Sequence, residues 1–403
     1  MFLKPLLAKN PKFVAAAIKL HRAGAIPANS YVIDLDTVAA NTRSLMDEAR
    51  AQQLTVYAMT KQIGRASGAL DVVTAAGIDG YVAVDMDCAR PITNNGHNLG
   101  HLGHLVQIPF AEAAEAATMQ PDYWTVFSHN KATEASKAAE QSGRIQNLLV
   151  RVFDPNDEFY TGHEGGVTIE ELPKMIDHIG KLPGARFAGV TTFPALLFDA
   201  GNASTRTTSN VMTLARAVEI AQRHLGSGYG SLEVNAPGTT STAVLGQLND
   251  IGATQVEPGH GLTGTTPLHA VTDLPEQPAV LYLSEVAHIH QGTPFCFGGG
   301  LYIDPVFGRY NTTALVAHDP SEISTAPIGV DIPDPAAIDY YAKLHPSKAR
   351  TFQEGATVIF GFRIQAFVTR ALVTCVTGAA TSTPSVTGVW DAKGNQTSWR
   401  PVQ

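Results

Sequence analysis

The stretch Thr55-Val-Tyr-Ala-Met-Thr-Lys61 decides the fold. Its apolar, aromatic and β-branched residues are followed by Gly64 and a helical pattern, as expected for a buried parallel strand that leads into a helix. Lys61 then lies at the carboxyl end of the strand, where α/β barrels carry their chemistry. A lysine in dry surroundings can form a Schiff base with a carbonyl compound, whereas a solvated lysine at the end of a strand has no such role.

Strand-like and helix-like segments alternate from this stretch onward for about 210 residues, close to the usual size of an eight-stranded α/β barrel. The eight predicted strands are residues 55–61, 80–85, 105–109, 123–128, 147–153, 187–193, 232–236 and 254–257. An open doubly wound sheet is disfavoured because no Gly-x-Gly-x-x-Gly motif follows a first strand. The sequence therefore predicts an α/β fold with a (β/α)8 barrel.

A different pattern begins after Pro267, where helical runs become scarce. Strands are predicted at residues 279–290, 301–304, 356–362 and 365–377, with turns and loops between them. We therefore predict a barrel domain at residues 31–268. The N-terminal helix of residues 1–30 and the mostly β C-terminal region of residues 269–403 would together form a second domain.

The overall composition excludes several classes of function. The net charge is -8 and no run of basic residues occurs, which argues against nucleic acid or an anionic membrane surface as a partner. No stretch has the roughly 18 uninterrupted apolar residues needed to cross a bilayer, and the N-terminus does not resemble a signal peptide. Three scattered cysteines do not suggest a disulfide framework. We therefore expect a cytoplasmic protein.

Two glycine-rich stretches follow the last two predicted strands. They are Asn235-Ala-Pro-Gly-Thr-Thr-Ser-Thr242 and Glu257-Pro-Gly-His-Gly-Leu-Thr-Gly-Thr-Thr266. Such clusters are usually turns. They also offer backbone N–H groups and hydroxyls, and barrels commonly hold a phosphate group on the loops after strands seven and eight. Their positions therefore predict a phosphate-binding site.

The chain resembles the alanine racemase-like, fold type III family of enzymes that use pyridoxal phosphate (PLP). The resemblance rests on Tyr31-Val-Ile-Asp-Leu-Asp36 with Asn41, a strand ending in Lys61, Gly189-Val-Thr-Thr-Phe193 and Glu257-Pro-Gly259. Within that family it is similar to the YhfX-like branch, judged by Tyr57-Ala-Met-Thr-Lys61, Gly100-His-Leu-Gly-His-Leu-Val-Gln-Ile-Pro109, Gly162-His-Glu-Gly-Gly166 and Phe297-Gly-Gly-Gly300.

The resemblance implies roles for particular residues. Lys61 would bind PLP covalently and act as one base at Cα, and Thr192 would lie under the pyridine ring. Glu257 would be the partner of the ring nitrogen. The phosphate would be held by Gly238, Thr239, Thr240, Ser241, Gly259 and His260. The expected function is an amino-acid racemase acting on a small amino acid.

Glu257 also makes a second reaction possible. Alanine racemases have an arginine at this position, whereas the similar decarboxylases have a Glu-Pro-Gly motif like that of this chain. A carboxylate keeps the ring nitrogen protonated and so makes PLP a stronger electron sink. The alternative function is therefore a PLP-dependent decarboxylase or lyase.

The second base of a racemase comes from the partner subunit in this family, which implies a homodimer. Alanine racemases use a tyrosine there, but the matching segment here is Phe295-Cys-Phe-Gly298. Cys296 or Tyr302 could act instead. Cys296 could equally be a small buried apolar residue with no catalytic role.

The group that would bind the substrate carboxylate is also different. Glu164 stands where racemases carry an arginine, and an acidic residue does not favour a carboxylate. His163, Arg65 or Arg309 could supply the positive charge.

Two groups of histidines could bind zinc, but we assign no metal to either. His97, His101 and His104 would share one face of a helix, although the glycines between them disfavour a helix. His288 and His290 precede Cys296 at a spacing that fits a zinc site poorly. A last alternative is a non-catalytic protein that carries PLP, which the additional β domain argues against.

Overall fold

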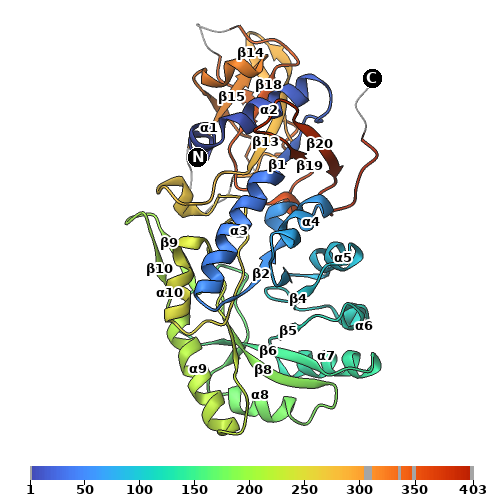
Figure 1. Cartoon of the computed structure of the whole chain (residues 1–403), viewed down its shortest axis with the longest axis vertical. Helices are drawn as coiled ribbons and strands as arrows, with labels where there is room; N and C mark the ends of the chain where they lie inside the picture. The colour runs from blue at the N-terminus through green and yellow to red at the C-terminus, as the bar shows by residue number, and fades with distance from the viewer. Residues whose placement is uncertain (1, 304–310, 335–336, 347–350, 400–403) are drawn as a thin grey trace. The chain divides into compact units, whose positions relative to one another are not determined.

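The computed structural model describes residues 2–303, 311–334, 337–346 and 351–399 (Figure 1). The chain forms two compact units. The barrel unit comprises Leu45–Thr60 and Gly77–Gly259, and the β unit comprises Met1–Ser44, Lys61–Ala76 and His260–Gln403. Residues 31–44, 61–76 and 260–268, which the predicted barrel domain included, thus belong to the β unit.

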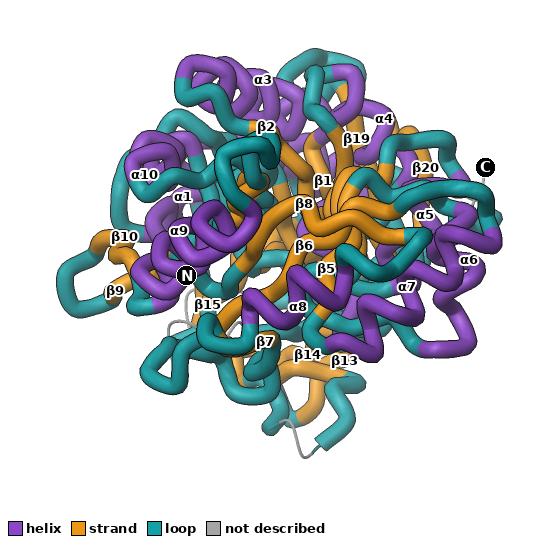
Figure 2. Tube along the Cα trace, turned by 90° about the horizontal axis from the view of Figure 1, so that it is seen from below, coloured by secondary structure: helices purple, strands orange, loops and turns teal. Residues whose placement is uncertain are grey.

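A closed barrel of eight parallel strands forms the centre of the barrel unit (Figure 2). In order around the barrel, the strands are β2 (Thr55–Met59), β3 (Gly80–Ala83), β4 (Leu99–Leu102), β5 (Tyr123–Val126), β6 (Gln146–Phe153), β8 (Ala185–Thr191), β11 (Glu233–Asn235) and β12 (Gln255–Val256). Pairing of β12 with β2 closes the ring. The predicted (β/α)8 barrel is confirmed.

The third barrel strand does not lie where the sequence predicted it. Residues 105–109 form a loop, and the strand is β4, with the sequence Leu-Gly-His-Leu. Glycine is poorly suited to a strand, but packing requires it at position 100. A Cβ atom on Gly100 would lie 2.2 Å from Cδ1 of Tyr57 in β2. Steric fit inside the barrel, which local propensity does not report, therefore places this strand.

Helices lie outside the barrel strands (Figure 2). They are α5 (Met86–Asn94), α6 (Ala113–Thr118), α7 (His129–Gln141), α8 (Leu172–Ile179), α9 (Asn210–Leu225) and α10 (Leu245–Asp250), with 3-10 turns η2 (Phe110–Glu112) and η3 (Thr242–Val244). α3 (Leu35–Ala51) and η1 (Thr60–Ile63) each contribute residues to both units. Capping fixes where helices begin: Asp85 Oδ1 accepts from the Cys88 N–H at the start of α5 (2.8 Å). The short strand β7 (Val167–Thr168) pairs with β6, and β9 (Leu196–Asp199) and β10 (Ser204–Thr207) form a hairpin after β8.

The interior of the barrel is polar. Tyr57 and Tyr123 have ring centroids 6.3 Å apart, and the Tyr123 hydroxyl donates to Glu233 Oε1 (3.0 Å). Their strands, β2, β5 and β11, are not neighbours in the sheet, so these contacts run through the barrel interior. Branched apolar residues usually fill such barrels. Tyrosine and glutamate side chains therefore fill part of this interior.

The β unit contains a second closed barrel, of six antiparallel strands. In order, these are β13 (Val280–His290), β14 (Thr293–Phe297), β17 (Tyr341–Leu344), β16 (Ile328–Asp331), β15 (Thr313–Ala317) and β18 (Thr357–Phe360). The sheet extends from β13 through β1 (Ser30–Asp34), β19 (Leu372–Thr377) and β20 (Ser385–Trp390). This confirms the predicted mostly β C-terminal domain. Two details were wrong. Residues 301–303 of the strand predicted at 301–304 are not in a strand, and residue 304 lies outside the described residues; the strand predicted at 365–377 begins only at Leu372.

Short helices complete the β unit: α1 (Leu3–Lys9), α2 (Pro11–Arg22), α4 (Ser67–Ala75), η4 (Pro267–Ala270), η6 (Pro320–Ser324) and η7 (Ala366–Val368). The predicted N-terminal helix is α2, whose buried Phe13 and Ile18 belong to one apolar core with Leu281 and Ile359. Among the described residues, no helix is both long and apolar enough to cross a membrane.

Candidate active site

Lys61 follows the carboxyl end of β2 directly, in the 3-10 turn η1. Its side chain is partly buried. Within the β unit, Lys61 lies close enough to His260 to act on it electrostatically, and so does Arg363. Burial, followed by the charges of Arg363 and Lys61, lowers the pKa of His260 well below its ordinary value. His260 is therefore a neutral imidazole near the proposed reactive lysine.

The His260 ring has one partner and one available nitrogen. Nδ1 lies 3.1 Å from the Thr265 hydroxyl, and within the described part of the chain Nε2 has no hydrogen-bond partner. The residue is only 8% exposed. Sequence analysis assigned His260 to phosphate binding through its backbone, and the structure adds a buried imidazole nitrogen that can bind a ligand.

Glu257 lies at the carboxyl end of β12, in the interior of the barrel unit. Its Oε1 is 2.5 Å from His101 Nδ1 and accepts from Asn235 Nδ2 at 2.9 Å. Its Oε2 is 3.3 Å from His104 Nε2. Thr125 contacts the other nitrogen of His101 at 2.5 Å. These side chains come from β4, β5, β11 and the loops after β4 and β12, so the barrel interior brings together residues far apart in sequence.

The surroundings of Glu257 keep it ionised. Burial raises the pKa of Glu257, but the charges of His104 and His101 and the hydrogen bonds from His101 and Asn235 lower it more. The net pKa of Glu257 therefore lies below its ordinary value. The result is a buried carboxylate with one oxygen occupied by two donors.

The three residues His101, His104 and Glu257 are also close enough to hold a metal ion, with ligand atoms within 4.8 Å of one another. Among described residues no other group of three or more His, Cys, Asp or Glu meets this criterion, so His288, His290 and Cys296 do not form such a cluster. His97 is not in the group either, because it packs edge-on against Tyr81. His101 lies in strand β4, so no helix forms there, as the intervening glycines indicated.

The loop after β11 contains the residues predicted to hold a phosphate. Gly238 and Thr239 have φ values of 151° and 40°, in the left-handed region that favours glycine. A Cβ atom on Gly238 would lie 2.8 Å from the Leu196 carbonyl oxygen. Thr240 and Ser241 are buried, and across the described residues the Ser241 hydroxyl has no hydrogen-bond partner. Gly259 lies in the loop after β12 and is also buried.

Thr192 follows β8 at the same end of the barrel. It is 1% exposed, and its hydroxyl has no hydrogen-bond partner in the part of the chain that the structure describes. The neighbouring Thr191 donates to Asn235 Oδ1 (2.7 Å) and so contacts the Glu257 cluster indirectly. Thr192 is therefore a buried polar group beside an organised polar interior.

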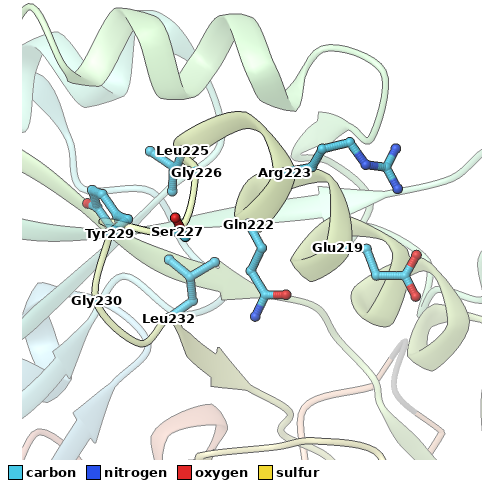
Figure 3. Close-up of a pocket in the computed structure, with 9 residues that line it drawn as sticks. All are labelled: Glu219, Gln222, Arg223, Leu225, Gly226, Ser227, Tyr229, Gly230 and Leu232. Carbon is cyan, nitrogen blue, oxygen red and sulfur yellow. The ribbon is translucent and has the colours of Figure 1, made fainter.

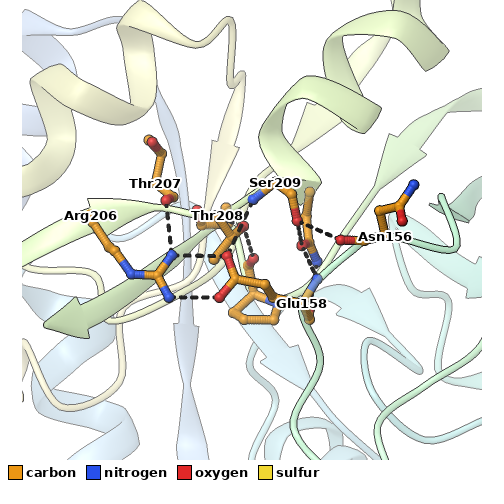
Figure 4. Close-up of polar contacts among 9 residues, drawn as sticks. Asn156, Glu158, Arg206, Thr207, Thr208 and Ser209 are labelled. Atoms are coloured by element: carbon orange, nitrogen blue, oxygen red, sulfur yellow. Dashed lines mark hydrogen bonds and ion pairs between the residues drawn. The ribbon is translucent and has the colours of Figure 1, made fainter.

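Loops over this end of the barrel are tied together by polar contacts (Figure 4). The Arg206 guanidinium donates to both carboxylate oxygens of Glu158, at 2.9 and 2.6 Å. Glu158 Oε1 also accepts from the Ser209 N–H (3.4 Å), and the Ser209 hydroxyl donates to the Asn156 carbonyl (3.2 Å). These contacts fix the loop after β6 against the hairpin and helix that follow β8.

A surface pocket of the barrel unit lies elsewhere (Figure 3). It has a volume of about 550 Å³ and lies between the end of α9 and the loop that leads into β11, with Tyr229 and Leu232 in its lining. It is thus at the amino ends of the strands. Barrel enzymes have their active sites at the carboxyl ends, so we do not place the site in this pocket.

The two candidates for the second base have different surroundings. Cys296 lies in β14 with no exposed surface, and burial raises its pKa to about 12. A thiol enclosed in this way is neutral at physiological pH and has the properties of an apolar core residue. Tyr302 is partly exposed.

The candidates for carboxylate recognition are dispersed. Glu164 is exposed, and its carboxylate accepts from the Gly162 N–H (2.8 Å). His163 is half-buried beside Phe193, with ring centroids 6.0 Å apart. Arg65 is buried in the β unit. Arg309 lies outside the described residues.

Sequence analysis missed several residues of the barrel interior. Asn235, Thr125 and Arg151 are buried in the strands. His101 and His104 were considered as metal ligands, loop-packing residues or substrate contacts, and not as partners of Glu257. The signal for Arg151 was available: it is a charged residue inside the apolar run Leu148-Leu-Val-Arg-Val-Phe153. Asn235 gave no distinct signal, because the glycine-rich motif that it begins explained its presence.

Comparisons with known proteins match this fold along almost the whole chain. Residues 33–267 match the alanine racemase N-terminal domain, and residues 281–386 match the YhfX-like C-terminal domain. The chain is 37% identical over 395 residues to the uncharacterized protein YhfX of Escherichia coli strain K12, covering 98% of this chain and 99% of that protein.

Solved structures with a similar fold are more distant in sequence. D-threonine aldolase from Filomicrobium marinum has a TM-score of 0.65 at 15% identity and covers 92% of this chain and 96% of its own. D-threo-3-hydroxyaspartate dehydratase from Delftia sp. HT23 has a TM-score of 0.64 at 16% identity, with coverage of 92% and 98%. Alanine racemase from Clostridium difficile 630 has a TM-score of 0.63 at 14% identity, with coverage of 91% and 99%. At these identities the likeness concerns the fold alone.

Proposed function

The chain belongs to the alanine racemase family, and from that premise we propose that it is a PLP-dependent enzyme that racemises a small amino acid at Cα. One observation carries the proposal. Lys61 follows the first strand of a closed parallel barrel, at the strand's carboxyl end, where this class of barrel places its chemistry.

The residues present fit the cofactor. Several buried side-chain atoms have no hydrogen-bond partner among the described residues. In the predicted site segments of the barrel unit these are the Thr192 and Ser241 hydroxyls and Glu257 Oε2, which lies 3.3 Å from His104 Nε2. His260 Nε2 is a fourth such atom, in the β unit. Buried polar atoms are normally hydrogen-bonded, so such atoms within the predicted site segments of each unit support the proposal that these segments bind polar groups of a ligand. Hydroxyls suit a phosphate, and a carboxylate oxygen suits a protonated ring nitrogen.

Each predicted residue has a defined task in this proposal. Lys61 would bind the cofactor covalently, and Glu257 would accept the ring N–H on Oε2, because Oε1 already accepts from two donors. Thr192 would contact the ring. The phosphate would be bound by Gly238, Thr239, Thr240, Ser241, Gly259 and His260. When bound, PLP withdraws electrons from Cα of an attached amino acid and so makes the bonds at Cα labile.

Racemisation requires one acid/base group on each side of Cα. Lys61 would remove or return the proton on one side. For the other side we propose Tyr302 of a partner subunit, since Tyr302 is partly exposed while Cys296 is enclosed in the β unit. The proposal therefore includes a homodimer, and it leaves Cys296 with a structural role.

A lyase is the second candidate function, and Glu257 favours it. A carboxylate at the ring nitrogen strengthens the electron sink more than a racemase needs. Proteins of similar fold include an aldolase and a dehydratase. Their sequence identity to this chain is low, so they support lyase chemistry on this fold and not a particular reaction. Decarboxylation on the same scaffold is a further possibility of the same kind.

Incubation with single-enantiomer amino acids in deuterium oxide tests these candidates. A racemase yields the opposite enantiomer with deuterium at Cα and the carboxylate retained, as read by chiral chromatography and mass spectrometry. A decarboxylase releases carbon dioxide, and a lyase cleaves the side chain. Lys61→Ala should abolish the reaction, whereas Lys174→Ala, an exposed lysine of α8 paired with Glu171, should not. If no amino acid changes, the chain is a PLP carrier instead of an enzyme.

A further inference from the structure

Arg151 has the largest fully buried side chain in the described protein. It lies near the carboxyl end of β6, in register with Thr191 of β8, and the residue is 1% exposed. Residues in register on parallel strands face the same side of the sheet. Thr191 bonds to Asn235, which in turn bonds to Glu257 inside the barrel. The Arg151 side chain therefore belongs to the same polar interior.

The guanidinium of Arg151 is only partly used by the protein. Its Nη2 donates to the His163 carbonyl oxygen at 2.6 Å and to the Phe193 carbonyl oxygen at 3.4 Å. Its Nε and Nη1 groups have no hydrogen-bond partner among the residues described. The bound carbonyls belong to loops after β6 and β8, so the side chain is fixed in place while two donor groups are left for another molecule.

Aromatic rings surround the charged group. The Arg151 Cζ atom lies 4.9 Å from the centre of the Phe127 ring and 6.0 Å from that of Phe159. Both phenylalanines are only half-buried, although Arg151 itself is enclosed. They come from the loops after β5 and β6, at the carboxyl end of the barrel. A cation held between apolar walls attracts an anion much more strongly than a cation in water does.

Arg151 carries its charge at physiological pH despite its burial. Burial lowers the pKa of Arg151 to about 10, and the nearby negative charge of Glu164 opposes this shift. Glu164 is exposed, and within the described part of the chain neither Nε nor Nη1 of Arg151 has a hydrogen-bond partner, so Glu164 does not satisfy these two donor groups. A buried charged group with unsatisfied hydrogen-bond donors is unfavourable, and strongly perturbed buried charges cluster at functional sites.

We infer that Arg151 binds the carboxylate of the substrate through its Nε and Nη1 groups, in place of the arginine that position 164 lacks. The inference rests on the proposed function and names the substrate class: amino acids with a free carboxylate and not the corresponding amines or amides. A monoanionic carboxylate fits better than a phosphate, because the charge of Glu164 repels a dianion more strongly.

This role also bears on the reaction. Loss of carbon dioxide requires the carboxylate to give up its negative charge, and a guanidinium that stabilises the charge opposes that step. Bond cleavage to hydrogen or to the side chain leaves the carboxylate intact. An arginine-bound carboxylate thus favours racemisation or lyase chemistry over decarboxylation.

The test compares propionate with propionamide, which has the same shape and no charge, in titration calorimetry of the full chain with and without added PLP. Propionate should bind wild type, and Arg151→Met should weaken its binding by about 100-fold, the loss expected for charge-assisted hydrogen bonds. Arg151→Lys keeps the charge but loses the two donor groups. It should bind propionate more weakly than wild type and more tightly than Arg151→Met. Arg186→Met is the matched control. It removes an exposed arginine at the opposite end of β8 and should bind propionate as wild type does.

Several results would overturn the inference. Wild type would bind propionate and propionamide equally, or would not bind propionate at all. Arg151→Met would bind propionate as wild type does. Inorganic phosphate would bind more tightly than propionate and would depend on Arg151. Thermal unfolding measures the structural role separately, because Arg151→Met also removes the hydrogen bonds to the His163 and Phe193 carbonyl oxygens. A large loss of stability without loss of propionate binding would show that Arg151 only holds loops. The visible absorbance of bound PLP is read separately, so failure of the cofactor to bind is distinguishable from failure of the carboxylate site.

Discussion

Replacing Glu257 with glutamine removes one charge from the interior of the barrel and leaves the shape of the side chain almost unchanged. In wild type, Oε1 of Glu257 contacts His101 Nδ1 at 2.5 Å and accepts from Asn235 at 2.9 Å, and Oε2 lies 3.3 Å from His104 Nε2. The amide oxygen of glutamine can replace Oε1, but the amide nitrogen places a donor where Oε2 faced His104.

The expected cost follows from these contacts. Removing one member of a buried charge pair costs about 3–5 kcal/mol, and Glu257→Gln should be near the lower limit because two hydrogen bonds are kept. For a unit of about 200 residues, about 3 kcal/mol lowers the melting temperature by about 6–12 °C. Glu233→Gln is the control. Its carboxylate accepts from the Tyr123 and Thr254 hydroxyls, and its loss should cost only about 1 kcal/mol.

Thermal unfolding followed by circular dichroism from about pH 3 to about pH 8, without added PLP, measures the effect. The folded-state pKa of Glu257 is below its ordinary value. Its contribution to stability is therefore fully present above the ordinary carboxyl pKa of about 4.3, and it is lost as the pH falls through the lower folded-state value. The difference between wild type and Glu257→Gln should be constant at neutral pH and shrink towards pH 4 and below. Equal melting temperatures at pH 7, or a difference that grows on acidification, would refute the reasoning.

Three further predictions concern packing, thiols and loops. Gly100→Ala should lower the free energy of unfolding by about 1–3 kcal/mol, because the added Cβ would collide with the ring of Tyr57 in β2. Gly228→Ala is the control and should have no such effect, because no atom lies within 4 Å of its added Cβ. Equal effects in thermal unfolding would contradict the packing argument. Cys296 should resist a thiol reagent at pH 8 until the chain unfolds, because burial raises its pKa to about 12, and rapid labelling of the folded protein would show otherwise. Glu158→Gln should lower the free energy of unfolding by less than about 1 kcal/mol, since the ion pair of Glu158 with Arg206 is partly exposed. The same variant should be cleaved faster by a protease in the β9–β10 hairpin. An unchanged cleavage rate would mean that the ion pair does not hold the loop.

Most of the fold follows from local sequence pattern. Seven of the eight barrel strands lie where apolar runs predicted them, because buried parallel strands are apolar over their whole length. The exception is instructive. The run Leu105-Val-Gln-Ile-Pro109 has a strand-like composition, but β4 uses Leu99–Leu102, whose glycine admits a tyrosine ring from β2. That requirement arises only when the barrel closes.

The site was less predictable for the same reason. Lys61 and the two glycine-rich loops could be predicted, because each is recognised from one short stretch of sequence. The contacts of Glu257 with His101 depend on β12 and β4 facing each other across the barrel, and no spacing along the chain encodes that. Arg151 is intermediate, because a charged residue in an apolar strand is visible in sequence while its unused donor groups are not.

The central claim is that Lys61 forms a covalent bond with PLP, and mass spectrometry after borohydride reduction tests it most directly. The protein is incubated with PLP, reduced, digested and analysed for the peptide that contains residue 61. The account predicts a pyridoxyl group on Lys61 and none on this peptide from Lys61→Ala. An unmodified peptide from wild type, or modification confined to other lysines, would contradict it.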